Sequence, residues 1–377
     1  MKFIQAGLVA LAFPVLLGAA PAEPVSQPIS KPAPAKAAPQ PVAKSVAKSA
    51  PAKPVAPAQP AADFSETKNY PQTVTFPGGV TLTEMTYSTL QGFRPLTLDL
   101  YQPQGKSDPR PVLVFIHGGN WVGGDSRHDS PFGDFPGLLA SIAARGYVVA
   151  SVNYRLADEA HFPAAVLDVK TAIRFLRTHA TDYNLDGTRF AAWGVSAGGH
   201  LASMIAVSCG VSALEPPTAS GDKPPSDCVQ AAIDWCGLID LETIYTDFDK
   251  PVPDTSVEGA FLGCEPALCP LEVAHNASPL TYISAMSPPF LIQHGDADTT
   301  VSVKQSQELY DALKAQGVPA ELVIYPGVAH MLARPGQTGS LAFDPETDKK
   351  AIEKLESFLD TSFPKKAALG AGKPAPN

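Results

Sequence analysis

The chain has 377 residues, of which 45% are hydrophobic and 17% are charged, and it carries a formal net charge of −9 with a pI near 5.4. This composition is ordinary for a globular protein and leaves ample material for a large core. The acidic balance argues against nucleic acid as a partner, because binding to phosphates requires a basic surface.

The N-terminal residues have the pattern of a secretory signal peptide. Lys2 supplies a positive start, and Leu8–Leu17 is an apolar stretch that is too short to span a bilayer. The small residues Ala20 and Ala22 then fit a cleavage site. We therefore predict a signal peptide over residues 1–22 and a secreted or periplasmic protein with no transmembrane segment after its removal. A retained anchor is the alternative.

The segment that follows has a biased composition. Residues 23–62 are mostly proline, alanine, lysine, valine, serine and glutamine, and they include no aromatic residue. Such a segment cannot bury enough apolar surface to offset the entropy lost on ordering it. We predict a disordered linker over 23–62, a similar tail over 364–377, and one folded domain over 70–363.

The hydrophobic pattern of the folded domain alternates between strands and helices. A hairpin is predicted over 80–87 and 96–101, followed by strands over 112–116, 148–152, 190–193, 231–235, 290–293 and 321–325. Helices are predicted over 163–180, 198–208, 304–316 and 345–359. This alternation implies an α/β domain with a mostly parallel central sheet covered on both faces. In such sheets, active residues gather at the carboxyl ends of the strands.

One serine stands between glycines where a predicted strand ends and a helix begins. The segment 194–198 (GVSAG) fits a nucleophile elbow, in which the tight turn leaves no room for side chains at Gly194 and Gly198. The helix N-terminus would then face the hydroxyl of Ser196 and favour developing negative charge. A phosphate-binding loop would need a longer glycine run and usually a lysine. A plain tight turn remains the simpler alternative.

A serine hydroxyl needs a base, and the candidates follow other predicted strands. His330 is expected to accept the proton of Ser196, and a carboxylate after the strand at 290–293 to orient that histidine. Asp296 and Asp298 lie two residues apart and cannot both face the imidazole. We favour Asp298 and expect Asp296 to brace its turn through local backbone bonds.

The loop after the strand at 112–116 is the expected oxyanion hole. Its glycines allow close approach of backbone N–H groups to a substrate oxygen, so the predicted donors are Gly119 and Ala197, with Gly118 as a further candidate. His117 is expected to brace this loop and His200 to act as a local brace in its helix. The remaining histidines, His128, His161, His179, His275 and His294, are interpreted as surface or packing residues.

Taken together, these motifs resemble the α/β-hydrolase superfamily. The segments 117–121 (HGGNW), 153–155 (NYR), 162–164 (FPA) and 194–199 (GVSAGG) are similar to its lipase and esterase branch, most of all to bifunctional feruloyl and acetylxylan esterases. The resemblance covers about residues 77–363, and it departs from hormone-sensitive-lipase relatives at Asn120, where they commonly have a third glycine. It implies an α/β-hydrolase fold with a small loop-rich cap.

The resemblance also implies a serine carboxylesterase that needs no cofactor. Its expected substrates are short acyl or aromatic acyl esters, either small molecules or esters attached to a polymer such as a polysaccharide. A serine peptidase of the prolyl-oligopeptidase type is one alternative, although such peptidases usually carry a large extra N-terminal domain. A second alternative is a lipase or polyesterase. A third is a catalytically inactive binding module, but the intact serine, aspartate, histidine and glycine loop argue against it.

The five cysteines suggest two disulfides, since an exported protein can form them. The spacing favours a small loop closed by Cys264 and Cys269, and a link between Cys209 and Cys228 that pins the ends of the segment between them. Cys236 then remains as a partly buried thiol. A metal site is the alternative, but it lacks matched cysteine and histidine spacing.

Aromatic residues near the strand ends are candidates for the substrate pocket. We expect Trp121, beside the oxyanion loop, to face the substrate and Trp193 to belong to the core, and we include Trp235 in the pocket. The proline-containing segment 252–279 is expected to form a partial lid that cannot build a long apolar helix. Activity on long-chain triacylglycerols is therefore not expected.

Overall fold

The computed structural model describes residues 73–128, 133–218, 223–248, 253, 255–337 and 344–364. The predicted signal peptide, the predicted linker and all but the first residue of the predicted tail lie outside these residues. Within the described part of the chain, no helix is both long and apolar enough to cross a membrane.

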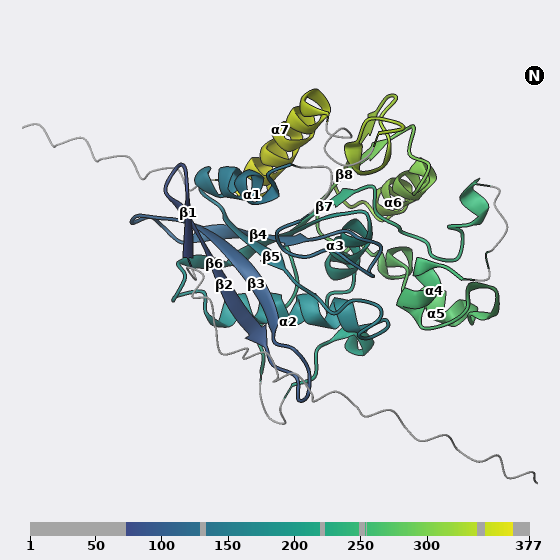
Figure 1. Cartoon of the computed structure of the whole chain (residues 1–377), viewed down its shortest axis with the longest axis horizontal. Coiled ribbons are helices and arrows are strands. Elements are labelled where there is room, and N and C mark those ends of the chain that lie inside the picture. Colours follow the sequence, from purple (N-terminus) through teal and green to yellow (C-terminus); the bar gives the residue numbers. More distant parts are fainter. Residues whose placement is uncertain are drawn as a thin grey trace, which may run out of the picture. The chain divides into compact units, whose positions relative to one another are not determined.

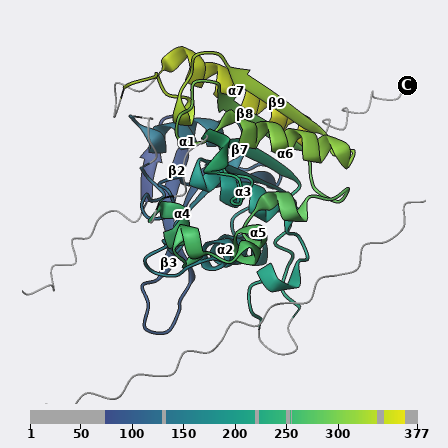
Figure 2. The same cartoon turned by 90° about the vertical axis from the view of Figure 1, so that its right-hand side faces the viewer.

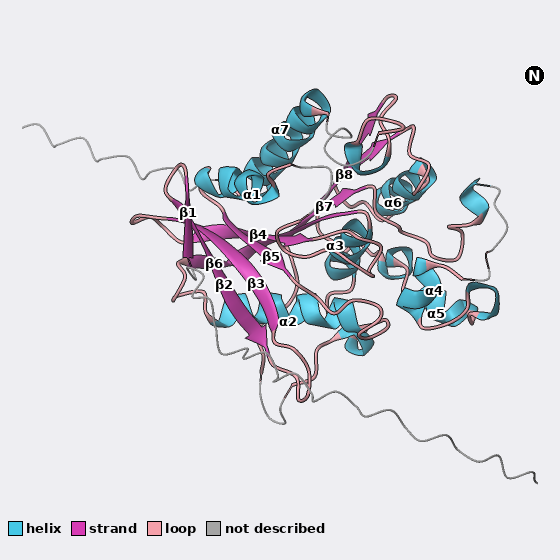
Figure 3. Ribbon diagram, in the orientation of Figure 1, coloured by secondary structure: helices cyan, strands magenta, loops and turns pink. Residues whose placement is uncertain are grey.

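A mixed sheet forms the centre of the described domain (Figure 3). In the described residues it has nine strands in the order β1-β2-β3-β5-β4-β6-β7-β8-β9. The strands are β1 (Thr73–Phe76), β2 (Val80–Ser88), β3 (Leu96–Pro103), β4 (Arg110–Ile116), β5 (Val148–Val152), β6 (Leu185–Val195), β7 (Ala231–Trp235), β8 (Phe290–Gly295) and β9 (Ala320–Tyr325). Strands β1 to β3 pair antiparallel, and β3 pairs antiparallel with β5. All later pairings are parallel, which confirms the predicted sheet.

Helices cover both faces of this sheet, as the alternating pattern predicted. The helices are α1 (Phe135–Ala144), α2 (Ala164–Thr178), α3 (Ala197–Val207), α4 (Val257–Leu262), α5 (Leu271–Asn276), α6 (Val303–Ala315) and α7 (Pro345–Ser362). Helices α1 and α7 pack on one face, and α2, α3 and α6 pack on the other (Figure 1). Successive residues of β4 alternate between these two cores, because side chains of a strand point to opposite faces.

The predicted strands and helices agree with the structure to within a few residues, but β1, α1, α4 and α5 were not predicted. Helix α1 has Gly137 in its first turn, where glycine lowers the helix propensity, whereas Pro136 is tolerated at the start of a helix. Its N-cap Asp134 accepts a hydrogen bond from the Gly137 N–H, and the helix buries Phe135 and Leu139. Packing on the sheet therefore stabilises a helix whose local sequence pattern is weak.

The segment 252–279 contains two short helices in place of a mostly irregular lid; residues 252 and 254 lie outside the described residues. Helices α4 and α5 have six residues each, and they lie next to each other in both views (Figures 1 and 2). We call α4, α5 and the loop between them the cap. Neither helix is long enough to offer an extended apolar face, as predicted.

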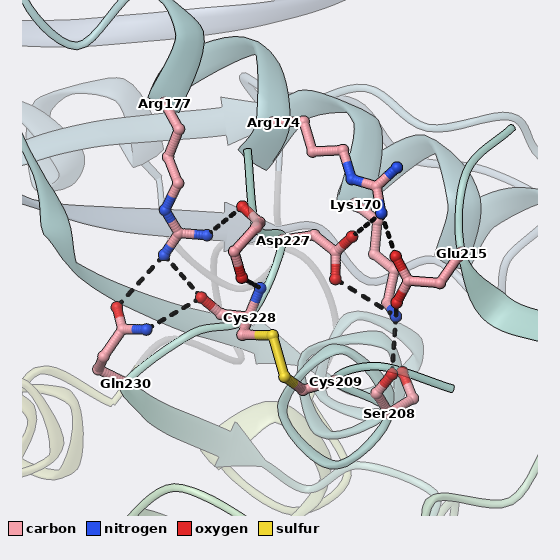
Figure 4. The surroundings of a disulfide bond; sticks show 10 residues. Lys170, Arg174, Arg177, Ser208, Cys209, Glu215, Asp227, Cys228 and Gln230 are labelled. Atoms are coloured by element: carbon pink, nitrogen blue, oxygen red, sulfur yellow. Dashed lines mark hydrogen bonds and ion pairs between the residues drawn. A yellow bond between two sulfur atoms is a disulfide. The ribbon is translucent and has the colours of Figure 1, made fainter. Parts of the chain in front are cut away.

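Both predicted disulfides are present. Cys209 is bonded to Cys228 and Cys264 to Cys269, and Cys236 is a free, buried cysteine. The first link lies beside a group of buried charges that includes Lys170 and Asp227 (Figure 4). The second closes the loop between the two helices of the cap.

Candidate active site

Three predicted residues meet at the carboxyl ends of parallel strands. Ser196 directly follows β6, Asp298 lies in the loop after β8, and His330 lies in the loop after β9. The Ser196 Oγ is 2.8 Å from Nε2 of His330, and Nδ1 of His330 is 2.6 Å from Oδ2 of Asp298. The structure therefore joins the serine, the histidine and the carboxylate in one chain of hydrogen bonds.

The turn that carries Ser196 has the geometry of a nucleophile elbow. Ser196 has φ 57° and ψ −121°, a strained conformation for a residue with a side chain. A Cβ atom on Gly194 would lie 2.0 Å from the carbonyl oxygen of Gly198. A Cβ atom on Gly198 would lie 2.0 Å from the carbonyl oxygen of Ile116, so the turn can close only with glycine at both positions.

The two candidate aspartates face different partners. Asp298 binds His330, whereas Asp296 accepts a hydrogen bond of 2.6 Å from the backbone N–H of Gly327. Asp296 therefore braces the loop that carries His330, and its partner lies further along the chain than the local turn we expected. The structure brings Asp298, and not Asp296, to the imidazole.

Asp298 is held as an anion. Its Oδ1 accepts backbone hydrogen bonds from Thr300 (2.7 Å) and Val301 (2.9 Å), and its Oδ2 contacts His294 and His330. Burial opposes ionisation, but the hydrogen bonds with the two histidines outweigh it and keep the pKa of Asp298 well below its ordinary value. The carboxylate thus stays charged beside His330 over the working range of most enzymes.

His294 contacts the candidate triad, which the sequence interpretation missed. It is fully buried, and its Nε2 lies 3.1 Å from Oδ2 of Asp298. We expected a surface or packing residue, so that interpretation is incomplete: His294 does pack in the core, but it also binds the carboxylate of the site. Its position at the end of an apolar strand, four residues before Asp298, is the signal that could have revealed this contact.

The loop after β4 has the compact geometry expected of an oxyanion loop. Gly119, Asn120 and Trp121 all have positive φ, and the carbonyl oxygen of Gly119 accepts hydrogen bonds from the backbone N–H groups of Val122 and Gly123. Gly118 precedes this turn. On the other side, Ala197 is the first residue of α3, where the helix itself supplies no acceptor for the N–H.

His117 braces this loop, as expected. Its ring stacks on Tyr154 with centroids 4.3 Å apart, and its Nδ1 lies 2.8 Å from the carbonyl oxygen of Gly118. Burial lowers the pKa of His117 to about 4, although the hydrogen bond to Gly118 favours the charged form. A buried, neutral imidazole fits a structural support better than it fits a base.

His200 does more than the local bracing we expected. It is fully buried on α3, and its Nδ1 accepts a hydrogen bond of 3.2 Å from Nε1 of Trp121. Its Nε2 donates to the carbonyl oxygen of Ala277, at 2.7 Å, just after α5. The ring of Trp121 also stacks on Phe261 of α4, with centroids 4.5 Å apart. His200 and Trp121 therefore connect the oxyanion loop to both helices of the cap.

The prediction that the side chains of Trp121 and Trp235 line the substrate pocket is wrong. Trp121 is only 1% exposed, because His200 and Phe261 enclose its ring. Trp235 is fully buried in the core on the other face of the sheet, where its ring meets that of Trp193 edge to face at 5.2 Å. Trp193 is a core residue, as expected.

One group of side chains in the described residues has ligand atoms close enough to share a metal ion. Cys236, Asp298 and His330 offer atoms within 4.8 Å of one another. However, Asp298 and His330 already bind each other, and burial raises the pKa of the Cys236 thiol well above its ordinary value. A metal ligand would have to be the thiolate, so this group fits a hydrogen-bonded triad better than a metal centre.

The chain is similar in sequence to several proteins that are named as esterases. LipM of Mycobacterium tuberculosis, named a probable carboxylic ester hydrolase, is 32% identical over 215 residues, which are 57% of this chain and 47% of LipM. The chain spans about half the length of LipM and of the related esterases LipC and LipQ from the same organism.

Several solved structures resemble this chain over about three quarters of its length, and the match includes nearly all of each solved chain. A truncated carbohydrate esterase from gut microbiota has a TM-score of 0.59 and 25% identity, covering 76% of this chain and 98% of that one. The thermophilic esterase Est2 of Thermogutta terrifontis has a TM-score of 0.57 and 28% identity, covering 77% and 95%. The family model of BD-FAE matches residues 98–313, more than half of the chain, including Ser196 and Asp298. The chain therefore belongs to the BD-FAE family and has the α/β-hydrolase fold that its motifs predicted.

Proposed function

We propose that the chain is a serine carboxylesterase that hydrolyses short acyl or aromatic acyl esters. The observation that carries this proposal is the hydrogen-bonded chain from Ser196 through His330 to Asp298. The names of the relatives support it, since LipM and Est2 are both named as ester hydrolases. The geometry matches the general requirement for an activated serine, in which the base is oriented by a third group.

In the acylation step, Nε2 of His330 accepts the hydroxyl proton as Oγ of Ser196 attacks the ester carbonyl carbon. The new C–O bond gives a tetrahedral intermediate whose oxygen carries the negative charge. The bond between this carbon and the alcohol oxygen then breaks, and the alcohol leaves with the proton from His330. Asp298 holds the imidazole and stabilises its charged form during the transfer.

In the deacylation step, water takes the place of the alcohol. His330 accepts a proton from the water, whose oxygen attacks the carbonyl carbon of the acyl-serine. The bond to Oγ of Ser196 then breaks, the proton returns to Oγ, and the free carboxylic acid leaves. In both steps the N–H groups of Gly119 and Ala197, with Gly118 as a further candidate donor, stabilise the oxyanion.

The size of the cap favours a compact acyl group. Long acyl chains need an extended apolar groove, whereas α4 and α5 have six residues each and are joined by a disulfide-closed loop. The contacts of Trp121 with Phe261 and His200 fill the space beside the oxyanion loop with buried rings. We expect esters of small molecules and of acylated polymers such as polysaccharides to be substrates, with a bulky alcohol lying outside the cap.

The proposal includes export. The two disulfides support an oxidising compartment, since such bonds persist outside the cytosol. The N-terminal charge and apolar pattern of residues 1–22 supports cleavage after Ala22. Expression in a Gram-negative host, followed by N-terminal sequencing of the periplasmic and secreted protein, would test this point directly.

Replacement of Ser196 tests the catalytic assignment. Ser196→Ala removes the attacking oxygen, so we expect the rate on nitrophenyl acetate to fall by several orders of magnitude, about 10⁴ or more, with the fold unchanged. Ser141→Ala, at an exposed serine of α1, is the matched control and should keep the full rate. A rate above about a tenth of the original in Ser196→Ala would overturn the proposal. Faster cleavage of a prolyl amide than of the ester would identify a peptidase instead.

A further inference from the structure

The carboxylate of the site has a second imidazole partner that the proposed reaction does not use. His294, at the end of β8, is fully buried, and so is Ser306 on α6. The Nε2 of His294 lies 3.1 Å from Oδ2 of Asp298, the same oxygen that binds His330. His294, at the end of β8, and His330, in the loop after β9, thus both bind Oδ2 of Asp298.

The partners of His294 fix its tautomer. Its Nε2 faces Oδ2 of Asp298 and, also at 3.1 Å, the carbonyl oxygen of Val301. Both groups are acceptors, so Nε2 carries a hydrogen. The Nδ1 atom lies 2.7 Å from Oγ of Ser306, a hydroxyl that can donate to it. The ring is therefore held at both nitrogens, with its N–H directed at Asp298.

We infer that His294, fixed by Ser306, is a positioning residue that sets the orientation and charge of Asp298 toward His330, an inference that rests on the proposed function. Oδ1 of Asp298 is held by two backbone N–H groups of its own loop. Among the described side chains, His294 is the one besides His330 that binds Oδ2. His294 therefore holds the carboxylate group of Asp298 in the orientation in which Oδ2 faces His330.

The N–H of His294 also affects the charge that His330 experiences. Each donor to Asp298 draws negative charge away from the bond with His330. Without the N–H of His294, more of that charge would act on His330 and favour its protonated form. A protonated imidazole cannot accept the proton of Ser196, so activity at low pH would be lost earlier, and the acid limb of the pH profile would move upward.

Two other titratable groups face this pair from β7 and the loop after it. Asp234 accepts hydrogen bonds from Ser203 and the backbone N–H of Gly237, and burial raises its pKa. Burial likewise raises the pKa of the Cys236 thiol. Both groups are the same in every variant proposed below, so a change in the pH profile would report on His294.

The test compares two substitutions of His294 with a control. His294→Leu removes the N–H, and we expect kcat/KM to fall about ten- to hundred-fold, mainly through kcat, with the acid limb moving up by about half to one pH unit. His294→Gln keeps a hydrogen-bond donor near the Nε2 position. It should therefore keep most of kcat/KM and leave the acid limb of the pH profile at its original pH. Ser306→Ala should cause a smaller change in the same direction. His179→Leu, at a more exposed histidine that contacts Asp182, should change neither quantity.

Active-site titration with a nitrophenyl phosphate triester separates positioning from folding, because it counts the molecules with a competent serine. If His294→Leu has fewer competent molecules but the original rate per site and the original acid limb, the role is structural and the inference is overturned. It is also overturned if His294→Gln behaves like His294→Leu. If His294→Leu fails to fold, the inference is judged from Ser306→Ala, which must lower kcat and move the acid limb upward, and from His294→Gln, which must not. The proposed function fails by a different result. It is overturned if Ser196→Ala, with His294 in place, keeps the rate of the unsubstituted enzyme.

Discussion

The two aspartates after β8 differ in role because they differ in what they face. Asp298 points at His330 and is surrounded by four hydrogen-bond donors, while Asp296 holds the backbone of Gly327. Their separation of two residues places them on different sides of one loop. Asparagine at each position keeps the size of the side chain and removes the charge, so the pair offers a matched comparison.

We predict that Asp298→Asn lowers kcat by about 10³ to 10⁴, because the imidazole loses the acceptor that fixes its tautomer. Asp296→Asn should leave most of the activity and lower the free energy of unfolding by about 1 kcal/mol, because a charged acceptor for the Gly327 N–H is replaced by a neutral one. Steady-state kinetics and chemical denaturation of both variants check this. The opposite ranking of the two activities would contradict the assignment.

Ser196, His330 and Asp298 could be predicted from the sequence because each follows a recognisable strand and their order along the chain suits this chemistry. The contacts of His200, His294 and Trp121 could not. His200 meets Trp121 and Ala277, which are 79 and 77 residues away, and local sequence carries no record of such partners. Trp121 was expected to face substrate because it adjoins the oxyanion loop, but Phe261 of the cap covers it.

At the scale of elements, the disulfide between Cys209 and Cys228 secures a buried charge cluster on α2 (Figure 4). Lys170 is fully buried, and its Nζ contacts the carbonyl oxygen of Ser208, a carboxylate oxygen of Glu215 and, at 3.5 Å, Asp227. Ser208 and Asp227 are the residues that directly precede the two cysteines. The link therefore keeps Ser208 and Asp227, two of the three partners of the lysine, in place.

We predict that Cys209→Ala with Cys228→Ala lowers the free energy of unfolding by about 3 kcal/mol from chain entropy alone. The true loss should be larger, because release of Asp227 would remove one of the two carboxylates that compensate the buried charge of Lys170. The matched control is Cys264→Ala with Cys269→Ala, whose shorter loop predicts about 2 kcal/mol. Denaturant unfolding of both double variants measures the difference. A difference of only about 1 kcal/mol, the value that the two loop lengths give by themselves, would show that the charge cluster does not depend on its disulfide.

Helix α7 carries a buried carboxyl group with an unusual pKa. Asp348 is 4% exposed, and neither of its oxygens has a hydrogen-bond partner in the described residues. Burial and the neighbouring Asp344 carboxylate raise the pKa of Asp348 to about 7, against a weaker attraction from the Asp344 backbone N–H. In the unfolded chain this group ionises near pH 4, whereas in the folded protein it stays protonated until about pH 7. Stability is therefore lost as the pH rises through this window.

We predict that Asp348→Asn stabilises the protein at pH 8, by up to about 4 kcal/mol, and has little effect at pH 4, because asparagine does not ionise in either state. Thermal unfolding at the two pH values checks this. Glu353→Gln, at an exposed acid of the same helix, is the control and should show no such pH dependence. A stabilisation that is equal at both pH values would mean that ionisation of Asp348 is not the cause.

The central elements could be predicted because their hydrophobic pattern and their packing agree. The continuous apolar run 112–116 of β4 is buried on both faces, as a parallel strand requires, and so are all five residues of β5. Helix α1 and the cap could not be predicted in the same way. Helix α1 has Gly137 in its first turn, and α4 and α5 are too short to show a helical period, so tertiary contacts determine these elements.

At the scale of the whole molecule, the short cap predicts the substrate range. We expect kcat/KM on nitrophenyl esters to be highest for acetate to about butyrate and to fall for longer chains. A long groove would instead gain about 0.8 kcal/mol of binding for each buried methylene group. A series of esters from acetate to palmitate measures this trend. A steady rise through decanoate, with activation at a lipid surface, would identify a lipase.

The residues of the hydrogen-bonded triad are also far apart along the chain. Ser196 and His330 are separated by 134 residues, and their strands join the sheet through β7 and β8. Non-local pairing of parallel strands is a slow event in folding. The hydrogen-bonded triad therefore cannot form until β9 has docked, and in a partly synthesised or partly folded chain Ser196 lacks the base His330. Under the proposed function, ester hydrolysis begins only after β9 has docked, so recovered activity can time this step of refolding.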